Sequence, residues 1–235
     1  MNCGQRPVTR MVVVLIIALN TGWAVAAELP KGFVRLREID ASIVQDMRYA
    51  GRGNFTGSKV PGYEAGECIL ARPVAQSLAQ VQKALSADGH GLMVFDCYRP
   101  VRAVQAFVRW ASGQGNGKDP VYHPNVAGNR LVSEGYIGAR SGHSSGGSID
   151  LTLGMVQQDG RFEPVEMGGR FDLFDPLSHV SAKSVSPEAR ANRKRLQQVM
   201  NRHGFSGYSR EWWHFRFADE PFAGQRFDFP VTAAD

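Results

Sequence analysis

The segment Ser141-Gly142-His143-Ser144-Ser145-Gly146-Gly147-Ser148-Ile149-Asp150 carries a histidine and an aspartate seven positions apart, with small residues between them. Polar and apolar residues alternate from 148 to 153, which is the pattern of a β-strand with one buried face. This pattern places Asp150 inside a predicted strand and His143 on the glycine-rich segment that leads into it. An imidazole and a carboxylate placed in this way are candidate ligands of a metal ion.

A second segment, Glu211-Trp212-Trp213-His214, supplies another imidazole and another carboxylate where the final strand is predicted to begin. If the two strands are neighbours in one sheet, His143, Asp150 and His214 can converge on one ion, with Glu211 over its open position. A mononuclear zinc hydrolase needs three such ligands, an open site for water and a general base that is not a ligand. We expect zinc to lower the pKa of the water, and Glu211 to take its proton and return it to the leaving amine.

Each part of this set has a simpler interpretation by itself. A lone histidine in a strand is more often a core residue with satisfied hydrogen bonds, and Asp150 alone fits a turn or a cap. An aspartate seven residues after one histidine, together with a glutamate three residues before another, is much harder to explain as packing. The sequence therefore favours a metal centre.

The first 27 residues are typical of a secretory signal peptide. Arg6 and Arg10 precede the apolar run 11–19, and Ala24-Val25-Ala26-Ala27 supplies the small residues of a cleavage site. A retained membrane anchor is the alternative, but the run is about half the length that crosses a bilayer. We expect residues 1–27 to be removed on export, with no membrane insertion afterwards, leaving one domain over 28–235 in the periplasm.

The charge of the mature chain argues against a nucleic-acid partner. Removal of the leader takes two arginines from the 27 basic residues and none of the 22 acidic ones, so the net charge falls from +5 to +3. The remaining basic residues form no tract with interleaved aromatic side chains.

If the chain is exported, its cysteines favour a disulfide. Only Cys68 and Cys97 remain after the leader is removed, an even pair in an oxidising compartment. A disulfide between them closes a loop of about 30 residues and stabilises the fold by about 2–4 kcal/mol. The alternative is two small buried residues that never meet. A role in binding zinc is weaker, because histidines and carboxylates already supply enough ligands.

Helical and strand patterns are mixed along the chain without a regular strand–helix–strand rhythm. Strands are predicted over 42–49, 91–96, 148–153 and 213–217, with a hairpin over 156–165, and helices over 70–85, 100–110 and 187–203. Residues 112–129 are rich in Gly, Asn and Pro and predict an irregular excursion. The pattern favours an α+β fold with a largely antiparallel sheet flanked by helices.

The two site segments resemble motifs of a known superfamily. Ser141 to Asp150 is similar to the S-x-H-x6-D metal motif that D-Ala-D-Ala peptidases share with the Hedgehog N-terminal domain, and Glu211 to His214 resembles their second motif. Further blocks resemble the VanX-type D-alanyl-D-alanine dipeptidases: Asp46-Met47-Arg48-Tyr49-Ala50, Asn54-Phe55-Thr56-Gly57, Tyr98-Arg99-Pro100, Asp150-Leu151-Thr152-Leu153 and Met167-Gly168-Gly169-Arg170-Phe171-Asp172. The resemblance runs from about residue 40 to 217 and implies the single-domain zinc fold of this superfamily.

The resemblance also implies a role for each site residue. One zinc ion is bound by His143, Asp150 and His214, with Glu211 as the base and acid. Arg99 matches the arginine that stabilises the tetrahedral intermediate, which suits the fixed donors of a guanidinium; a surface salt bridge is the alternative. Asp172 matches the acid that holds the substrate ammonium, and Ser141 is expected to hydrogen-bond the substrate. Both also fit turns or caps.

The implied activity is hydrolysis of the free dipeptide D-Ala-D-Ala, a small-molecule substrate, to two D-alanines. An exported enzyme is better suited to scavenge dipeptide released during cell-wall turnover than to confer antibiotic resistance, because resistance requires the dipeptide to be destroyed in the cytoplasm. One alternative is a D,D-carboxypeptidase, which trims wall-linked peptides in an open groove. Another is a zinc-containing binding module without activity, although the presence of both Glu211 and Arg99 argues against a dead site. The oligomeric state stays open.

Overall fold

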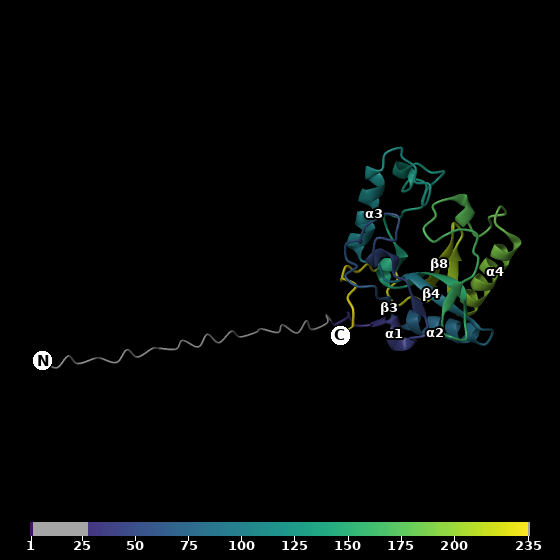
Figure 1. Ribbon diagram of the computed structural model, residues 1–235, viewed down its shortest axis with the longest axis horizontal. Coiled ribbons are helices and arrows are strands. Elements are labelled where there is room, and N and C mark those ends of the chain that lie inside the picture. The colour runs from purple at the N-terminus through teal and green to yellow at the C-terminus, as the bar shows by residue number, and fades with distance from the viewer. Residues whose placement is uncertain (2–27, 235) are drawn as a thin grey trace.

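A six-stranded sheet runs through the protein. Its strands lie in the order β2 (Val44–Gln45), β4 (His90–Asp96), β5 (Ser148–Val156), β8 (Glu211–Phe217) and β7 (Phe205–Tyr208), and β6 (Phe162–Pro164) pairs with β5. The computed structural model (Figure 1) describes Met1 and residues 28–234, so the predicted leader, apart from Met1, lies outside the described residues. The β2–β4 pair is parallel and the other pairs are antiparallel. The predicted α+β fold with a largely antiparallel sheet is confirmed.

Two long helices, α2 (Arg72–Ser86) and α4 (Pro187–Arg202), pack against this sheet and against each other. Pro73 occupies the first turn of α2, where its missing N–H has no intrahelical partner to lose. The helix buries an apolar stripe whose members are spaced three or four residues apart: Val74, Leu78, Val81 and Leu85. Helix formation and core burial are therefore specified by the same residues.

The third long helix, α3 (Val101–Gly113), begins directly after Pro100, as the sequence predicts. The remaining elements are short. They are the two-stranded sheet of β1 (Phe33–Arg35) and β3 (Ile69–Ala71), helix α1 (Leu36–Ile39), and the 3₁₀ helices η1 (Arg48–Ala50), η2 (Gly128–Arg130), η3 (Gly142–Ser145) and η4 (Pro176–Ser178). In the part of the chain that the structure describes, no helix combines the length and apolarity needed to span a membrane.

The strand predicted over 42–49 is wrong beyond its first half. Pairing with β4 is confined to Val44–Gln45, and the chain then turns into η1. Tyr49 on η1 is buried, and its ring packs against Phe55 and Phe107. Burial of this aromatic ring in a turn replaces continued strand pairing, although the alternating pattern alone does not distinguish the two outcomes.

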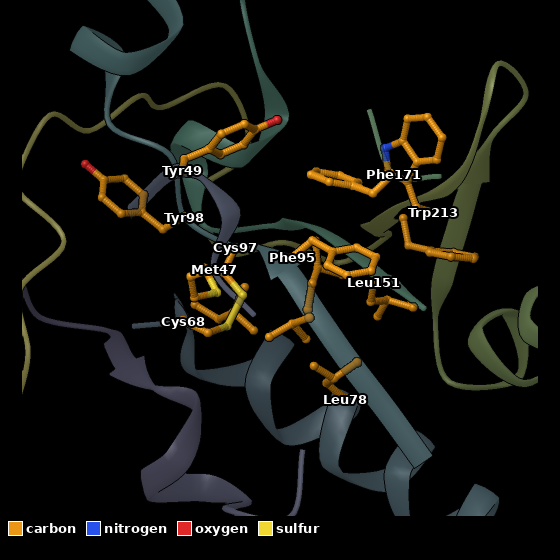
Figure 2. Close-up of a cluster of buried hydrophobic side chains, with 14 of the residues drawn as sticks. Met47, Tyr49, Cys68, Leu78, Phe95, Cys97, Tyr98, Leu151, Phe171 and Trp213 are labelled. Carbon is orange, nitrogen blue, oxygen red and sulfur yellow. A yellow bond between two sulfur atoms is a disulfide. The ribbon is translucent and has the colours of Figure 1, made fainter. Parts of the chain in front are cut away.

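The structure joins Cys68 and Cys97 in a disulfide, the pairing that the sequence predicts. Cys68 precedes β3 and Cys97 follows β4, and their Cα atoms lie 5.3 Å apart. Both residues are fully buried, and Figure 2 shows the bond in the same cluster of core side chains as Leu78 of α2. The crosslink therefore ties the ends of two separate sheets together.

Candidate active site

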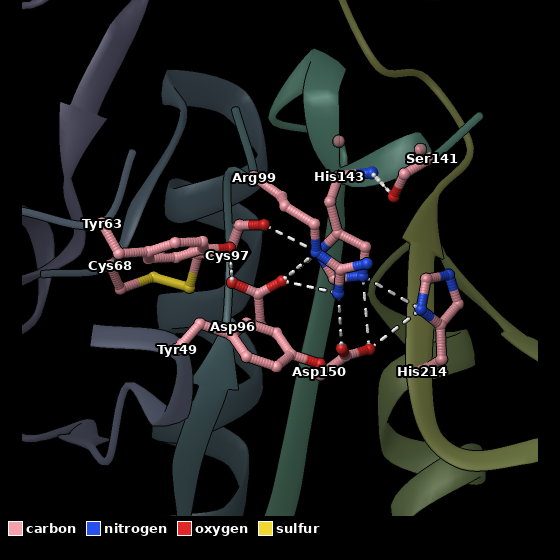
Figure 3. Close-up of polar contacts among 12 residues, drawn as sticks. Tyr49, Tyr63, Cys68, Asp96, Cys97, Arg99, Ser141, His143, Asp150 and His214 are labelled. Carbon is pink, nitrogen blue, oxygen red and sulfur yellow. Dashed lines mark hydrogen bonds and ion pairs between the residues drawn. A yellow bond between two sulfur atoms is a disulfide. The ribbon is translucent and has the colours of Figure 1, made fainter. Parts of the chain in front are cut away.

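Two neighbouring strands and one 3₁₀ helix bring the predicted metal ligands together. Asp150 on β5 is the direct partner of His214 on β8, and paired residues of an antiparallel ladder present their side chains on the same face. His143 lies on η3, immediately before β5. Gly146 ends η3 with a φ of +74°, a left-handed conformation that suits glycine and turns the chain toward the strand. Figure 3 shows the three side chains converging.

Three ligand atoms meet at this point: Nε2 of His143, Oδ1 of Asp150 and Nδ1 of His214. The distance from His214 Nδ1 is 2.9 Å to Asp150 Oδ1 and 3.1 Å to His143 Nε2, and His143 Nε2 lies 3.3 Å from Asp150 Oδ1. A tetrahedral zinc ion with bonds of about 2.0–2.1 Å separates its ligand atoms by about 3.3 Å. Two imidazoles and one carboxylate at these separations fit a zinc ion.

The backbone of the disulfide segment orients one of these ligands. Nδ1 of His143 lies 2.7 Å from the carbonyl oxygen of Cys97. Because a carbonyl oxygen can only accept, the proton of the imidazole sits on Nδ1 and Nε2 keeps its lone pair for a metal. Burial raises the pKa of Asp150, but the adjacent imidazoles of His143 and His214 lower it by more, so it lies far below its ordinary value. Asp150 is therefore anionic, as a carboxylate ligand of a metal must be.

Arg99 reaches this site from the segment between β4 and α3. Its Nε and Nη2 contact Oδ2 of Asp96 at 2.8 and 2.7 Å, and Nη2 lies 3.5 Å from Oδ2 of Asp150. Oδ1 of Asp96 accepts a hydrogen bond from the Tyr63 hydroxyl at 2.6 Å. The guanidinium also lies over the rings of Tyr49 and Phe107, which fix its plane. Among residues 28–234, Nη1 of Arg99 donates no hydrogen bond, so one edge of the fork is free for another partner.

Glu211 stands beside the ligand cluster without joining it. Its Oε2 lies 3.9 Å from Nδ1 of His214, and burial raises the pKa of Glu211 to about 7. A carboxyl group poised near neutral pH is suited to accept and donate a proton. Glu211, Arg99 and the three ligand residues all line one cavity of about 250 Å³.

Asp172 lines the same cavity from a loop between β6 and η4. Both of its carboxylate oxygens lie 3.0 Å from the Tyr49 hydroxyl, and these are the only side-chain hydrogen bonds that residues 28–234 make to it. Burial and the nearby charge of Asp150 raise the pKa of Asp172 well above its ordinary value. A buried acid that lacks a cationic partner is a natural receptor for a positively charged ligand group.

Ser141 lies at the edge of the cavity and caps η3. Its Oγ accepts a hydrogen bond from the backbone N–H of His143 at 3.2 Å, which is the capping role that the sequence left open. The expected hydrogen bond to substrate stays a prediction.

The sequence motifs assign no role in the site to Asp96, Tyr63, Tyr49 or the carbonyl of Cys97. Asp96 stands three residues before Arg99 at the end of an apolar strand, and this spacing is a signal that could have found it. Tyr49 comes from η1 and Tyr63 from the segment between η1 and β3, both distant in sequence from the ligand segments, and only the fold brings them to the site.

Loss of any one ligand should empty the metal site. We expect His143→Ala, Asp150→Ala and His214→Ala each to weaken zinc binding by more than about 100-fold, because changes to outer-shell partners alone cost about 10–100-fold. Zinc content measured by atomic emission after dialysis, on protein with an unchanged circular dichroism spectrum, checks this. Full zinc content in all three variants would exclude the assigned site.

Comparisons with known proteins agree over almost the whole described chain. A model of the peptidase M15 family, described as D-ala-D-ala dipeptidase, matches residues 30–232. The D-alanyl-D-alanine dipeptidase of Enterococcus faecium is 40% identical over 201 residues, covering 85% of this chain and 98% of that protein. The corresponding protein of Enterococcus faecalis is 38% identical over 205 residues, covering 87% and 100%. Among solved structures, that of the LdcB LD-carboxypeptidase aligns with a TM-score of 0.43 and 15% identity, over 83% of this chain and 72% of its own.

Proposed function

Because this chain belongs to the D-Ala-D-Ala dipeptidase family, we propose that it hydrolyses free D-Ala-D-Ala to two molecules of D-alanine with one zinc ion per chain. One observation carries the proposal: Glu211, a carboxylate outside the ligand cluster, stands beside three converged metal-ligand atoms in a small cavity. A hydrolytic metal site needs this division between ligands and base. The dipeptidases of the two Enterococcus species support the choice of substrate.

The residues divide the chemistry among themselves. Bound zinc would polarise the scissile carbonyl and lower the pKa of a water molecule that it holds. Glu211 takes the proton of the attacking water and passes it to the departing amine nitrogen. The free edge of the Arg99 guanidinium donates to the carbonyl oxygen as negative charge develops there. Asp96 holds this guanidinium in place by accepting from Nε and Nη2 of Arg99.

The shape of the cavity favours a dipeptidase over a carboxypeptidase. Its volume of about 250 Å³ is below the range of roughly 300–1,000 Å³ that is usual for larger ligands. Asp172 is 4% exposed and lines the cavity. The positive charge of a dipeptide's ammonium group would favour the ionised form of this carboxyl group and pair with it. A peptide whose amino group is blocked offers no such charge and leaves this acid buried without a cationic partner.

Acetylation of the substrate tests this choice. We expect D-Ala-D-Ala to be cleaved and N-acetyl-D-Ala-D-Ala to be cleaved at least about 100-fold more slowly, because the acetylated peptide cannot form the buried ion pair with Asp172, and loss of one partner of such a pair costs about 2–5 kcal/mol. Asp172→Asn should raise the KM for the free dipeptide and narrow the gap between the substrates. Release of D-alanine measures both rates. Equal cleavage of the two peptides by the wild type would favour the D,D-carboxypeptidase.

The rate should also depend on pH through Glu211. A general base acts only when deprotonated, and burial raises the pKa of Glu211 to about 7, so kcat/KM should fall as the pH drops below about 7. The positive charge of bound zinc would lower the pKa of Glu211 and so move this fall in kcat/KM toward lower pH. A profile that stays flat down to about pH 4, with zinc retained, would contradict the role of Glu211.

We also propose a location for the enzyme, from its predicted leader and its cysteines. The signal-peptide pattern of residues 1–27 and the Cys68–Cys97 disulfide both support export to the periplasm. There the enzyme would meet dipeptide released during wall turnover. Cell fractionation with N-terminal sequencing tests this; an uncleaved protein in the cytosol would refute it.

A further inference from the structure

Helix α4 carries an arginine whose side chain is buried although it contacts no acid. Arg193 is 2% exposed, and no carboxylate in the described part of the chain forms an ion pair with it. Its three guanidinium nitrogens instead donate to three backbone carbonyl oxygens: Nε to Met167 at 2.6 Å, Nη1 to His179 at 2.8 Å and Nη2 to Leu177 at 3.0 Å. A buried cation is costly unless it finds hydrogen-bond acceptors, and here one segment of backbone accepts a hydrogen bond from each of the three guanidinium nitrogens.

That segment, residues 167–179, is called the acid loop below because it carries Asp172. The hydrogen bonds of Arg193 fall at its two ends, with Met167 at the start and Leu177 and His179 at the close. One planar side chain therefore sets the separation of the two ends of the loop. A lysine has one nitrogen and cannot reproduce this three-way fork.

The acid loop presents Asp172 in a conformation that needs support. Asp172 has a φ of +61° and is the only residue other than glycine with a positive φ among those described. Its neighbour Phe171 packs against Phe95 and Trp213 (Figure 2), which anchors the middle of the loop in the core. With the ends fixed by Arg193 and the middle fixed by Phe171, the carboxylate of Asp172 is directed to the Tyr49 hydroxyl and the cavity.

We infer that Arg193 is a positioning residue for recognition of the substrate ammonium: it holds the acid loop so that Asp172 faces the cavity. The inference rests on the proposed function, since it concerns the ammonium of a free dipeptide. Arg193 does not line the cavity, and its hydrogen bonds reach none of the metal-ligand residues. Its loss should therefore impair substrate binding and leave the metal and the base in place. The Arg193 guanidinium also lies 5.9 Å from the ring centroid of Trp212 on β8, so zinc content must be measured in each variant.

The test compares Arg193→Met and Arg193→Lys with a matched control on the same helix. Arg190 is exposed and donates to the carbonyls of Lys183 and Val185, outside the acid loop, so Arg190→Met removes a similar side chain without touching the loop. We expect both Arg193 variants to raise the KM for D-Ala-D-Ala about 10-fold or more, with one zinc per chain retained and kcat changed less than KM. Arg190→Met should keep the wild-type KM.

KM separates positioning from simple destabilisation, because it does not depend on the fraction of the protein that is folded and active. If Arg193→Met does not fold, Arg193→Lys, which keeps the charge and one donor, carries the test. An unchanged KM in the folded Arg193 variant would overturn the inference. The inference would also be overturned if Arg190→Met raised the KM for D-Ala-D-Ala as much as the Arg193 variants do.

Hydrogen exchange supplies a readout that is independent of activity. Amides of residues 167–179 should exchange faster in Arg193→Lys than in the wild type or Arg190→Met, while those of β5 stay protected. If the wild type does not cleave D-Ala-D-Ala, the proposed function fails, and exchange in the acid loop still shows whether Arg193 holds it. Unchanged exchange there refutes the positioning role even in an active enzyme.

Discussion

Glu211→Gln is expected to lose about 10³-fold or more in kcat while it keeps one zinc per chain. Glutamine preserves the shape of the side chain but can no longer accept a proton from water, and loss of a general base costs about 10²–10⁴-fold. The ligand atoms of His143, Asp150 and His214 lie within 3.3 Å of one another without Glu211, whose Oε2 is 3.9 Å from the nearest imidazole nitrogen. Zinc affinity should therefore be nearly unchanged.

The measurement is turnover of D-Ala-D-Ala at saturating substrate, together with zinc content, for the wild type and Glu211→Gln. The matched control is Glu134→Gln, since Glu134 pairs with Arg130 at the surface and does not line the cavity. A Glu211→Gln protein that has lost its zinc would show that this residue is a ligand. One that turns over at the wild-type rate would show that another group is the base.

Arg99→Ala is expected to lower kcat by about 10²–10³-fold, because a preorganised donor to a developing oxyanion contributes that much. The substitution also leaves Asp96, which is fully buried, without its cation, so stability must be measured alongside activity. Arg99→Lys keeps the positive charge but loses the fork, and should recover part of the activity.

A surface arginine nearby supplies the control for this comparison. Arg102 is exposed and pairs with Asp228 at 3.0 Å, so Arg102→Ala should keep the wild-type kcat. If Arg99→Ala keeps its kcat and loses only stability, the guanidinium serves the fold through Asp96 and does not act on the reacting carbonyl.

The sequence predicts the ligand set well because its signals are local. His143 and Asp150 share one short segment and one strand, and Glu211 and His214 share another. The remaining step, that β5 and β8 are neighbours, is a hypothesis from the sequence alone, and the direct pairing of Asp150 with His214 confirms it. The long helices were predicted for the same reason, since a repeated apolar spacing needs no tertiary information.

What the sequence could not give depends on contacts between distant segments. β1, β3 and β7 have three or four residues each, too few for a clear alternation. Tyr63 meets Asp96 across 33 positions, Tyr49 meets Asp172 across 123, and Arg193 reaches Met167 across 26. These contacts position the residues that the motifs name, and they become visible only when the chain is folded.

All the roles proposed for these residues require that the three-ligand site with Glu211 hydrolyses a free dipeptide with a bound metal. The direct measurement is D-alanine released from D-Ala-D-Ala by purified protein, before chelation, after chelation and after zinc is restored. We expect two D-alanines per dipeptide from the untreated protein. Activity should be lost when the chelator removes the metal and should return when about one zinc per chain is restored. Hydrolysis that persists in metal-free protein, or no D-alanine from the zinc-loaded wild type, would contradict the proposed roles.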